Sequence, residues 1–368
     1  MRGRQVQATA EAFAISQSIT GAVTAIMRDH RPYGRRAHIP RWCPRDSRPR
    51  GCGCRDRPAP DSRSRSATRE RAVIVTVRPP VDGGTALITG ASSGIGREFA
   101  AQLAARAGTL VVVARRAGLL EELRAELIAA HPRLQVVALP VDLSDERDVD
   151  RCVAALHEQA GAVDILINNA GIGDQALFDA TDWTRTRQIL HTNVVAVAQL
   201  TALLVPSMVE RGRGGVLNMG SGAGLTVMPA AAAYSASKHF VDGFSEALRA
   251  DLAGTGVVVT QVCPGPVDSD FDTVAGTAGG MTGGPPQFLR ISAARCAREA
   301  LAGFDAGKPL VFPGRAYRVT MRALPLLPRT LQRRQAASSA ARLRSKAAHA
   351  AAGPRSVHTG ISDRETPT

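Results

Sequence analysis

The chain has 368 residues, enough for one large domain or two ordinary ones, and a formal net charge of +14 at pH 7. The positive charge lies at the ends: residues 1–78 carry 17 basic and 6 acidic residues, residues 315–368 carry 11 and 2, and the middle carries 18 and 24, which argues against nucleic-acid binding by the central region. Its isolated cysteines argue against a disulfide framework, and the lack of an uninterrupted run of about 18 apolar residues argues against a membrane-spanning helix.

Residues 1–78 are rich in Arg, Ser, Pro and Gly, which predicts a disordered basic extension. Three explanations stay open for it. A transit peptide is Arg- and Ser-rich but poor in acids, whereas this segment holds several Asp. A metal or nucleic-acid module would use Cys43, Cys52 and Cys54, whose spacing lacks the paired C-x-x-C of zinc sites. We favour the third, in which the segment is not natural and translation starts near Val73–Val77.

From Thr85 onward, short β-branched runs alternate with helical patterns. The predicted strands are Thr85–Thr89, Thr109–Ala114, Leu134–Val141, Val163–Ile167, Gly215–Met219, Val257–Val262 and Pro309–Phe312. The predicted helices end near Arg106, Ala130 and Ala160 or span Thr184–Val205, Ala231–Ala253 and Ser292–Ala306. Strand–helix alternation implies right-handed crossovers. We therefore predict one α/β domain over residues 79–314, a doubly wound parallel seven-stranded sheet (Rossmann fold) with helices on both faces.

The first predicted strand runs into the sequence T-G-A-S-S-G-I-G, residues 89–96. Glycines permit a tight turn and close backbone approach, and the N-terminus of the following helix offers free N–H groups to a pyrophosphate. The loop is therefore predicted to bind a dinucleotide. A ligand-free turn is the alternative, but a strand before the loop and a helix after it favour the nucleotide.

Tyr234 and Lys238 stand four residues apart in an Ala-rich segment that favours helix, so both side chains project from one face. A free tyrosine titrates near about 10, and an adjacent cation lowers that pKa. Ser221, 13 residues before Tyr234, follows a predicted strand, and its hydroxyl at the strand end could meet the carbonyl oxygen that Tyr234 protonates. A solvated helix face is the alternative for the Tyr–Lys pair alone.

Taken in order, these motifs resemble the short-chain dehydrogenase/reductase family in its single-domain form, over roughly residues 80–315. The positions that match the family's cofactor site are Thr89, Gly90, Ser92, Ser93, Gly94, Ile95, Gly96, Asp142, Leu143, Asn169, Ala170, Gly171, Pro264, Gly265, Val267 and Ser269. The positions that match its catalytic residues are Asn193, Ser221, Tyr234 and Lys238, of which the last two also bind cofactor.

The resemblance implies hydride transfer between a nicotinamide and a substrate carbon. Tyr234 would exchange a proton with the substrate oxygen, Ser221 would orient that oxygen, and Lys238 would lower the pKa of Tyr234 and hold the nicotinamide ribose. Asn193 would position a water near the lysine. The resemblance also implies a homodimer or homotetramer formed through the helices near Thr184–Val205 and Ala231–Ala253.

Two positions depart from the family pattern. Gly220-Ser221 stands where the family often has Ser-Ser, and Asp268-Ser269 stands where a Thr usually follows the Pro-Gly-Pro-Val segment. The second strand ends in Ala114-Arg115-Arg116 with no acid to hold the ribose hydroxyls of NAD. Because guanidinium groups pair with phosphate, Arg115 and Arg116 favour NADP over NAD, although they could instead solvate a loop.

The Gly- and Pro-rich segment Asp268–Leu289 is predicted to be a lid over the substrate. Val267, Phe271, Met281 and Phe288 could line an apolar pocket or serve as ordinary packing. Residues 315–346 alternate Arg with Leu, which predicts a basic amphipathic helix within the tail 315–368; it would lie on an anionic membrane surface, on its own domain or in solvent. Residues 347–368 are predicted to be disordered.

Together these observations predict a cytoplasmic, homo-oligomeric NADP-dependent oxidoreductase, with peripheral membrane contact through 315–346 as an option. Its substrate would be a carbonyl or secondary alcohol of a small to medium apolar compound. A non-catalytic nucleotide sensor or scaffold of the same fold is the main alternative; it would normally lose Tyr234 or Lys238. An epimerase or dehydratase would need a larger C-terminal domain. Nucleic-acid binding through the Arg-rich ends is a third alternative, although no nucleic-acid partner is expected.

Overall fold

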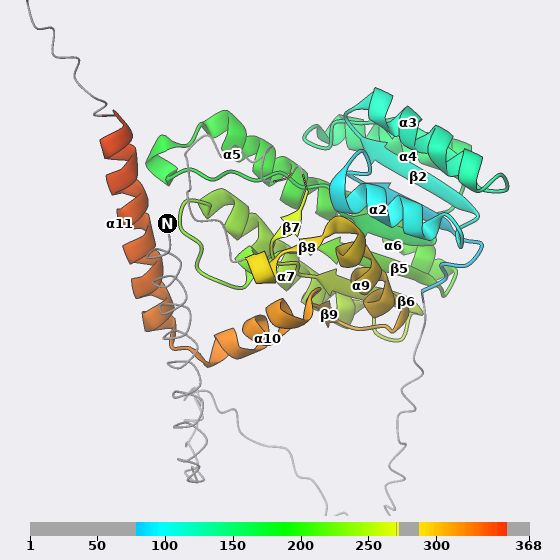
Figure 1. Ribbon diagram of the computed structural model, residues 1–368. Helices are drawn as coiled ribbons and strands as arrows, with labels where there is room; N and C mark the ends of the chain where they lie inside the picture. Colours follow the sequence, from blue (N-terminus) through cyan, green and yellow to red (C-terminus); the bar gives the residue numbers. More distant parts are fainter. Residues whose placement is uncertain (1–78, 270, 272–286, 352–368) are drawn as a thin grey trace, which may run out of the picture. The chain divides into compact units, whose positions relative to one another are not determined.

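The computed structural model describes residues 79–269, 271 and 287–351 (Figure 1). The predictions made for residues 1–78, for most of the lid segment with Met281, and for residues 352–368 lie outside this described part. Within it the strand–helix alternation holds, and the domain of residues 79–314 can be compared element by element with the expected pattern.

A single sheet of seven parallel strands forms the centre of the domain, in the order β3-β2-β1-β4-β5-β6-β9. The strands are β1 (Thr85–Thr89), β2 (Thr109–Ala114), β3 (Gln135–Pro140), β4 (Ile165–Asn168), β5 (Gly214–Met219), β6 (Val257–Val262) and β9 (Leu310–Val311). The order reverses between β1 and β4, so the carboxyl ends of these two strands open a crevice of the kind that binds dinucleotides. The predicted Rossmann fold is confirmed.

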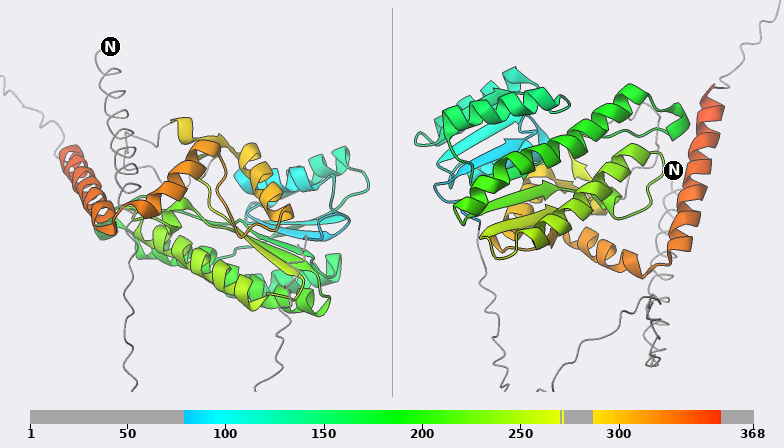
Figure 2. Two further views of the ribbon diagram at one scale, coloured as in Figure 1. Left: turned by 90° about the horizontal axis from the view of Figure 1, so that it is seen from below. Right: turned by 180° about the vertical axis from the view of Figure 1, so that it is seen from behind.

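Helices cover both faces of the sheet, in two layers (Figure 2). On one face lie α2 (Gly94–Leu103), α3 (Ala117–Ala130) and α9 (Ala293–Asp305); on the other lie α4 (Glu146–Ala160), α6 (Ala196–Glu210) and α7 (Ala232–Asp251). Alternate residues of each strand enter the two cores: Ile88 packs with Phe99 and Phe304, and Leu87 with Leu156 and Leu200. Each such side chain stabilises the fold by about 1.5–3 kcal/mol, which is why the strands are apolar throughout.

The long helix predicted near Thr184–Val205 has three parts. Helix α5 (Trp183–Leu190) passes through a π-helical turn, η2 (His191–Val195), into α6. Among the described residues, the stretch Trp183–Glu210 is long and apolar enough to cross a membrane by length and composition alone. Its second half packs into the core on one face of the sheet through Ala196, Leu200, Leu204, Val205 and Met208, and a core helix satisfies the same criterion.

A small parallel pair, β7 (Val267–Asp268) with β8 (Ile291–Ser292), was not predicted. Strands of two residues are too short to show a periodic pattern in the sequence. These two strands connect the segment after β6 with the start of α9. An ion pair between Arg290 and Asp268, at 3.1 Å, lies beside them. The two ends of the predicted lid segment are therefore held together.

The prediction of one continuous basic helix over residues 315–346 is wrong, because this stretch forms two helices. Helix α10 (Arg315–Ala323) is followed by a 3₁₀ turn, η6 (Leu324–Leu326), and by α11 (Arg329–Ala351). Pro325 and Pro328 cannot continue the first helix, because proline lacks the N–H donor. Among the tail side chains that the structure describes, the buried apolar ones are Tyr317 and Met321 on α10, and that side of the helix packs on the domain. Membrane contact by the rest of the tail stays a prediction.

Candidate active site

The loop between β1 and α2 is built on three glycines. Gly90 adopts a positive φ of 68°, and a Cβ there would lie 2.9 Å from the Cα of Ala170. A Cβ on Gly96 would lie 2.2 Å from the carbonyl oxygen of Gly90, so the first turn of α2 packs directly on the loop. Only glycine permits this turn and this contact. The loop and the segment after β4 therefore form one compact wall.

Thr89 and Asn169 join that wall by hydrogen bonds. The Thr89 hydroxyl donates to the carbonyl of Ile167 at 3.2 Å and accepts from the backbone N–H groups of Asn169 and Ala170, both at 3.0 Å. The Asn169 amide in turn donates to the Thr89 carbonyl at 2.8 Å. Two predicted cofactor segments, distant in sequence, are thus brought together at the crevice.

The N-terminus of α2 is suited to a pyrophosphate. Ser93 precedes the helix in extended conformation, and its side chain makes no capping hydrogen bond, so helix N–H groups remain for an anion. Arg116 reaches across from the end of β2 and donates to the hydroxyls of Ser92, at 2.9 Å, and Ser93, at 2.6 Å. The residues present therefore fit a dinucleotide, and a guanidinium stands beside the loop.

Asp142, predicted to contact adenine, lies after β3 with the buried Leu143 next to it. Burial by itself would raise the pKa of the Asp142 carboxyl, but hydrogen bonds from Ser144 and the charge of Arg115 outweigh burial and hold that pKa below its ordinary value. The carboxyl is thus kept ionised as an acceptor at the adenine end of the crevice, and Arg115 is placed close to it.

Asn193 is fully buried in the π-helical turn η2. Its side-chain oxygen accepts from the N–H of Ile172 at 2.9 Å, and its amide nitrogen donates to the carbonyl of Ile172 at 2.9 Å and to the Ser237 hydroxyl at 3.0 Å. π-turns of this kind are frequent at functional sites. Ser237 donates to the carbonyl of Tyr234 at 2.7 Å, so Asn193 is tied to the turn of α7 that carries the tyrosine.

Lys238 lies one turn after Tyr234 on α7 and is 5% exposed. Its Nζ donates to the Met219 carbonyl at 2.8 Å and lies 5.8 Å from the centre of the Tyr234 ring. Burial, opposed in part by Cys263, lowers the pKa of Lys238 to about 8. A Cβ on Gly171 would lie 3.4 Å from both Lys238 Nζ and Asn193 Oδ1, so the lysine and the asparagine converge on that glycine.

Ser221 follows β5 at the same edge of the sheet, and its hydroxyl accepts from the N–H of Ala223 at 3.2 Å. The preceding departure from the family pattern has a steric reason: a Cβ on Gly220 would lie 2.7 Å from Cys263 Sγ and 2.8 Å from Gln261 Nε2. A serine at position 220 would require the side chains of Cys263 and Gln261 to shift, so Ser221 supplies the hydroxyl at the end of this strand.

The segment after β6 completes the crevice. The Pro264 carbonyl accepts from the N–H of Gly222 at 3.2 Å, Val267 begins β7, and a Cβ on Gly94 would lie 3.3 Å from the Cβ of Ser269. Ser269 thus stands over the N-terminus of α2, where the second departure from the family pattern still presents a hydroxyl.

Of the predicted pocket residues, Phe271 lies beside the predicted catalytic tyrosine: its ring is tilted to the Tyr234 ring, and the two ring centres are 5.7 Å apart. Phe288, in contrast, is 72% exposed on the turn η5 (Gln287–Leu289). Two residues near the site were not predicted. Ser237 could have been found from its position three residues after Tyr234. Tyr317, on α10, carries no sequence signal, since it lies outside every motif.

The profile of the short chain dehydrogenase family matches residues 84–278, more than half of the chain. The chain belongs to the short-chain dehydrogenase family. An uncharacterized oxidoreductase of Myxococcus xanthus is 42% identical over 187 residues, 51% of this chain and 73% of that protein. The human dehydrogenase/reductase SDR family member 7 is 33% identical over 58% of this chain and 65% of its own length.

Solved structures agree with this placement. A short-chain dehydrogenase from Sphingobium yanoikuyae in complex with NADPH matches with a TM-score of 0.59 and 31% identity, over 66% of this chain and 92% of that one. A short-chain dehydrogenase/reductase from Burkholderia phymatum in complex with NAD gives 0.59 and 26%, over 66% and 93%. The predicted family and the predicted class, an NAD(P)-dependent oxidoreductase, are confirmed.

Proposed function

We propose that this short-chain dehydrogenase uses NADP(H) to reduce a carbonyl, or to oxidise a secondary alcohol, in a small to medium apolar compound. The observation that carries the proposal is the buried Lys238 ammonium beside the Tyr234 ring on one face of α7. With a pKa of about 8, Lys238 is mostly protonated at neutral pH. A buried cation favours the phenolate that forms when the tyrosine gives up its proton.

When bound, NADPH supplies the hydride. In reduction, Tyr234 gives its phenolic proton to the carbonyl oxygen as negative charge develops there, and Ser221 donates a hydrogen bond to the same oxygen. Lys238 donates one of its three N–H groups to the Met219 carbonyl, and this bond fixes the position of the ammonium. The other two N–H groups can donate to other partners. Asn193 holds the backbone of Ile172 and the Ser237 hydroxyl, and thereby positions the turn that carries Tyr234.

The preference for NADP over NAD is supported by Arg116. The guanidinium donates to the hydroxyls of Ser92 and Ser93 in the dinucleotide loop, and the two residues between β2 and α3, Arg115 and Arg116, include no acid. A 2′-phosphate would find a cation here, whereas the ribose diol of NAD would lack the carboxylate that usually accepts its hydrogen bonds.

Self-association through α5–α6 and α7 is part of the proposal. The exposed surface of these helices carries Trp183 and Leu203, and Phe240 stacks on Phe244 at 5.4 Å on α7. Apolar side chains that gather on exposed helices favour a second copy of the chain as the partner. Light scattering coupled to size-exclusion chromatography measures the state directly, and a monomer at micromolar concentration would contradict it.

The full-length protein tests the catalytic proposal. NADPH and NADH are titrated by their fluorescence, and NADPH oxidation is then followed with a panel of aldehydes and ketones. Tyr234→Phe keeps the ring and removes only the hydroxyl, so it should bind NADPH like the wild type and turn over about 100-fold or more slowly. Undiminished turnover in Tyr234→Phe would remove the tyrosine from the chemistry, and failure of both nucleotides to bind would remove the oxidoreductase proposal.

A further inference from the structure

Tyr317 reaches the active site from α10, outside every motif of the family. It is 8% exposed, and it occupies the space beside two glycines of the active-site loops. A Cβ on Gly222 would lie 1.9 Å from the Tyr317 hydroxyl oxygen, and a Cβ on Gly265 would lie 2.6 Å from a ring carbon. Gly222 directly follows Ser221, so one face of the tyrosine ring borders the loop that presents the serine hydroxyl.

The Tyr317 hydroxyl also lies within electrostatic reach of the reacting group. Burial raises the pKa of Tyr317 well above its ordinary value, and the charges that Cys263 and Tyr234 would carry on ionisation raise it further. Tyr317 therefore stays neutral. Its role at the site is to fill space and to offer one hydroxyl, not to exchange protons.

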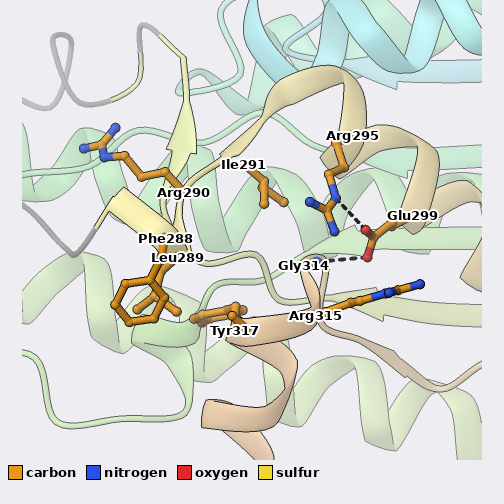
Figure 3. A pocket seen from close by; sticks show the side chains of 10 residues that line it. Phe288, Leu289, Arg290, Ile291, Arg295, Glu299, Gly314, Arg315 and Tyr317 are labelled. Carbon is orange, nitrogen blue, oxygen red and sulfur yellow. Dashed lines mark hydrogen bonds and ion pairs between the residues drawn. The ribbon is translucent and has the colours of Figure 1, made fainter. Parts of the chain in front are cut away.

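A pocket of about 540 Å³ also borders Tyr317 (Figure 3). Its lining is mixed: the exposed Phe288 and the half-buried Leu289 lie next to Tyr317, the buried Ile291 lies above them, and charged side chains complete the wall. Among these charged side chains, Glu299 accepts from the N–H of Gly314 at 2.9 Å and from Arg295 at 2.9 Å. This volume falls within the range of small-molecule sites, about 300–1,000 Å³.

We propose that Tyr317, which contacts both the loop after Ser221 and this pocket, separates the two and thereby sets the size limit of the substrate. The inference rests on the proposed carbonyl reduction. With the ring in place, a substrate carbonyl beside Ser221 and Tyr234 carries one small substituent toward α10. Without the ring, the second substituent extends into the space lined by Leu289 and Ile291, and ketones with two bulky apolar groups become substrates.

The first experiment compares selectivity among three variants of the full-length protein. Acetophenone and benzophenone differ in one substituent, methyl against phenyl, and kcat/KM is measured for each with NADPH. Tyr317→Ala should raise the benzophenone-to-acetophenone ratio about tenfold or more, the scale on which apolar pockets discriminate. Tyr317→Phe keeps the ring and should keep the wild-type ratio.

Met321→Ala is the matched control. Met321 is buried one turn later on α10 and its methyl group lies 3.7 Å from the Cβ position of Gly222, but it does not line the pocket. It should leave the ratio unchanged. An unchanged ratio in a Tyr317→Ala protein that binds NADPH overturns the inference. An equal change in Met321→Ala also overturns it, since loosened packing of α10 would then be the cause.

A second measurement does not depend on turnover. In a xenon-pressurised crystal of Tyr317→Ala, or of Tyr317→Leu if the alanine variant does not fold, xenon density that runs unbroken from Ser221 to Ile291 supports the partition. Two separate xenon sites overturn it. Because this readout needs no substrate, a wild type that reduces none of the panel refutes the proposed carbonyl reduction, while the xenon result still decides the role of the ring.

Discussion

Replacement of Lys238 by methionine should separate stability from activity. Folding lowers the pKa of Lys238 from 10.5 to about 8 because the ammonium is buried. Each pKa unit corresponds to about 1.4 kcal/mol, so holding the proton costs the folded state about 3 kcal/mol at pH 7. Methionine has a similar shape and no charge, but it leaves the Met219 carbonyl without its donor, a loss of about 1 kcal/mol. Lys238→Met should therefore be more stable than the wild type by about 2 kcal/mol at pH 7, and inactive.

The pH dependence gives the sharper test. The folded pKa lies below the unfolded one, so between pH 8 and 10.5 the unfolded chain binds more protons and wild-type stability rises with pH. The advantage of Lys238→Met should shrink by about 2 kcal/mol between pH 7 and pH 9.5. Urea unfolding of the apo protein, followed by circular dichroism, measures this difference.

Lys308→Met is the control, because the Lys308 side chain is exposed and its replacement should give the same small change at both pH values. If the stability difference between the wild type and Lys238→Met does not change with pH, the lysine is not desolvated in the folded apo protein. The argument that a buried cation drives the chemistry of Tyr234 would then lose its basis.

Three further substitutions test other contacts of the site. Arg116→Ala should weaken NADPH binding about ten- to a hundredfold by fluorescence titration and leave NADH binding nearly unchanged, since it removes a charged donor to phosphate; an equal loss for both nucleotides would contradict the selectivity argument. Gly222→Ala should lower the free energy of unfolding by about 1–3 kcal/mol when made in the wild type, and by much less when made in the Tyr317→Ala variant. The reason is that the added methyl group clashes with the tyrosine, while neither backbone strain nor a positive φ is involved. Additive effects in the double mutant would refute this. Asn193→Ala leaves two buried backbone groups of Ile172 unpaired and should cost about 2–6 kcal/mol in urea unfolding; a loss below 1 kcal/mol would show that the π-turn relaxes.

The parts of the fold that the sequence predicts are those with repeated local signals. Seven β-branched runs and the helices between them were placed within a few residues, because a strand buried on both faces must be apolar along its length. The glycine loop and the Tyr234–Lys238 pair were visible for the same reason, since each depends on spacing within one turn or one loop. Their contacts with one another follow from the topology of a parallel sheet, whose carboxyl ends meet at one edge.

The features that were missed have causes that lie far apart in the chain. β7 and β8 are two residues each, and their pairing depends on a contact across more than twenty positions. The π-turn at Asn193 lies in the stretch H-T-N-V-V, whose residues have low helix propensity, and low propensity alone does not identify a π-turn. The break between α10 and α11 was marked by Pro325 and Pro328, but the spacing of Arg and Leu across them suggested one helix.

Tyr317 shows why the substrate side of such a site resists sequence analysis. The cofactor side is built from backbone turns, which require glycine and short polar residues at fixed positions and so leave a pattern. The substrate side is shaped by the volume of side chains, which leaves no fixed pattern in the sequence. Tyr317, which we propose for this role, comes from α10, more than eighty positions after Tyr234. Gly222 and Gly265 have ordinary φ values, so what excludes a side chain at these positions is the tyrosine ring and not the backbone. If Tyr317 has the role that we propose, changes in α10 would alter which substrate fits without touching Ser221, Tyr234 or Lys238.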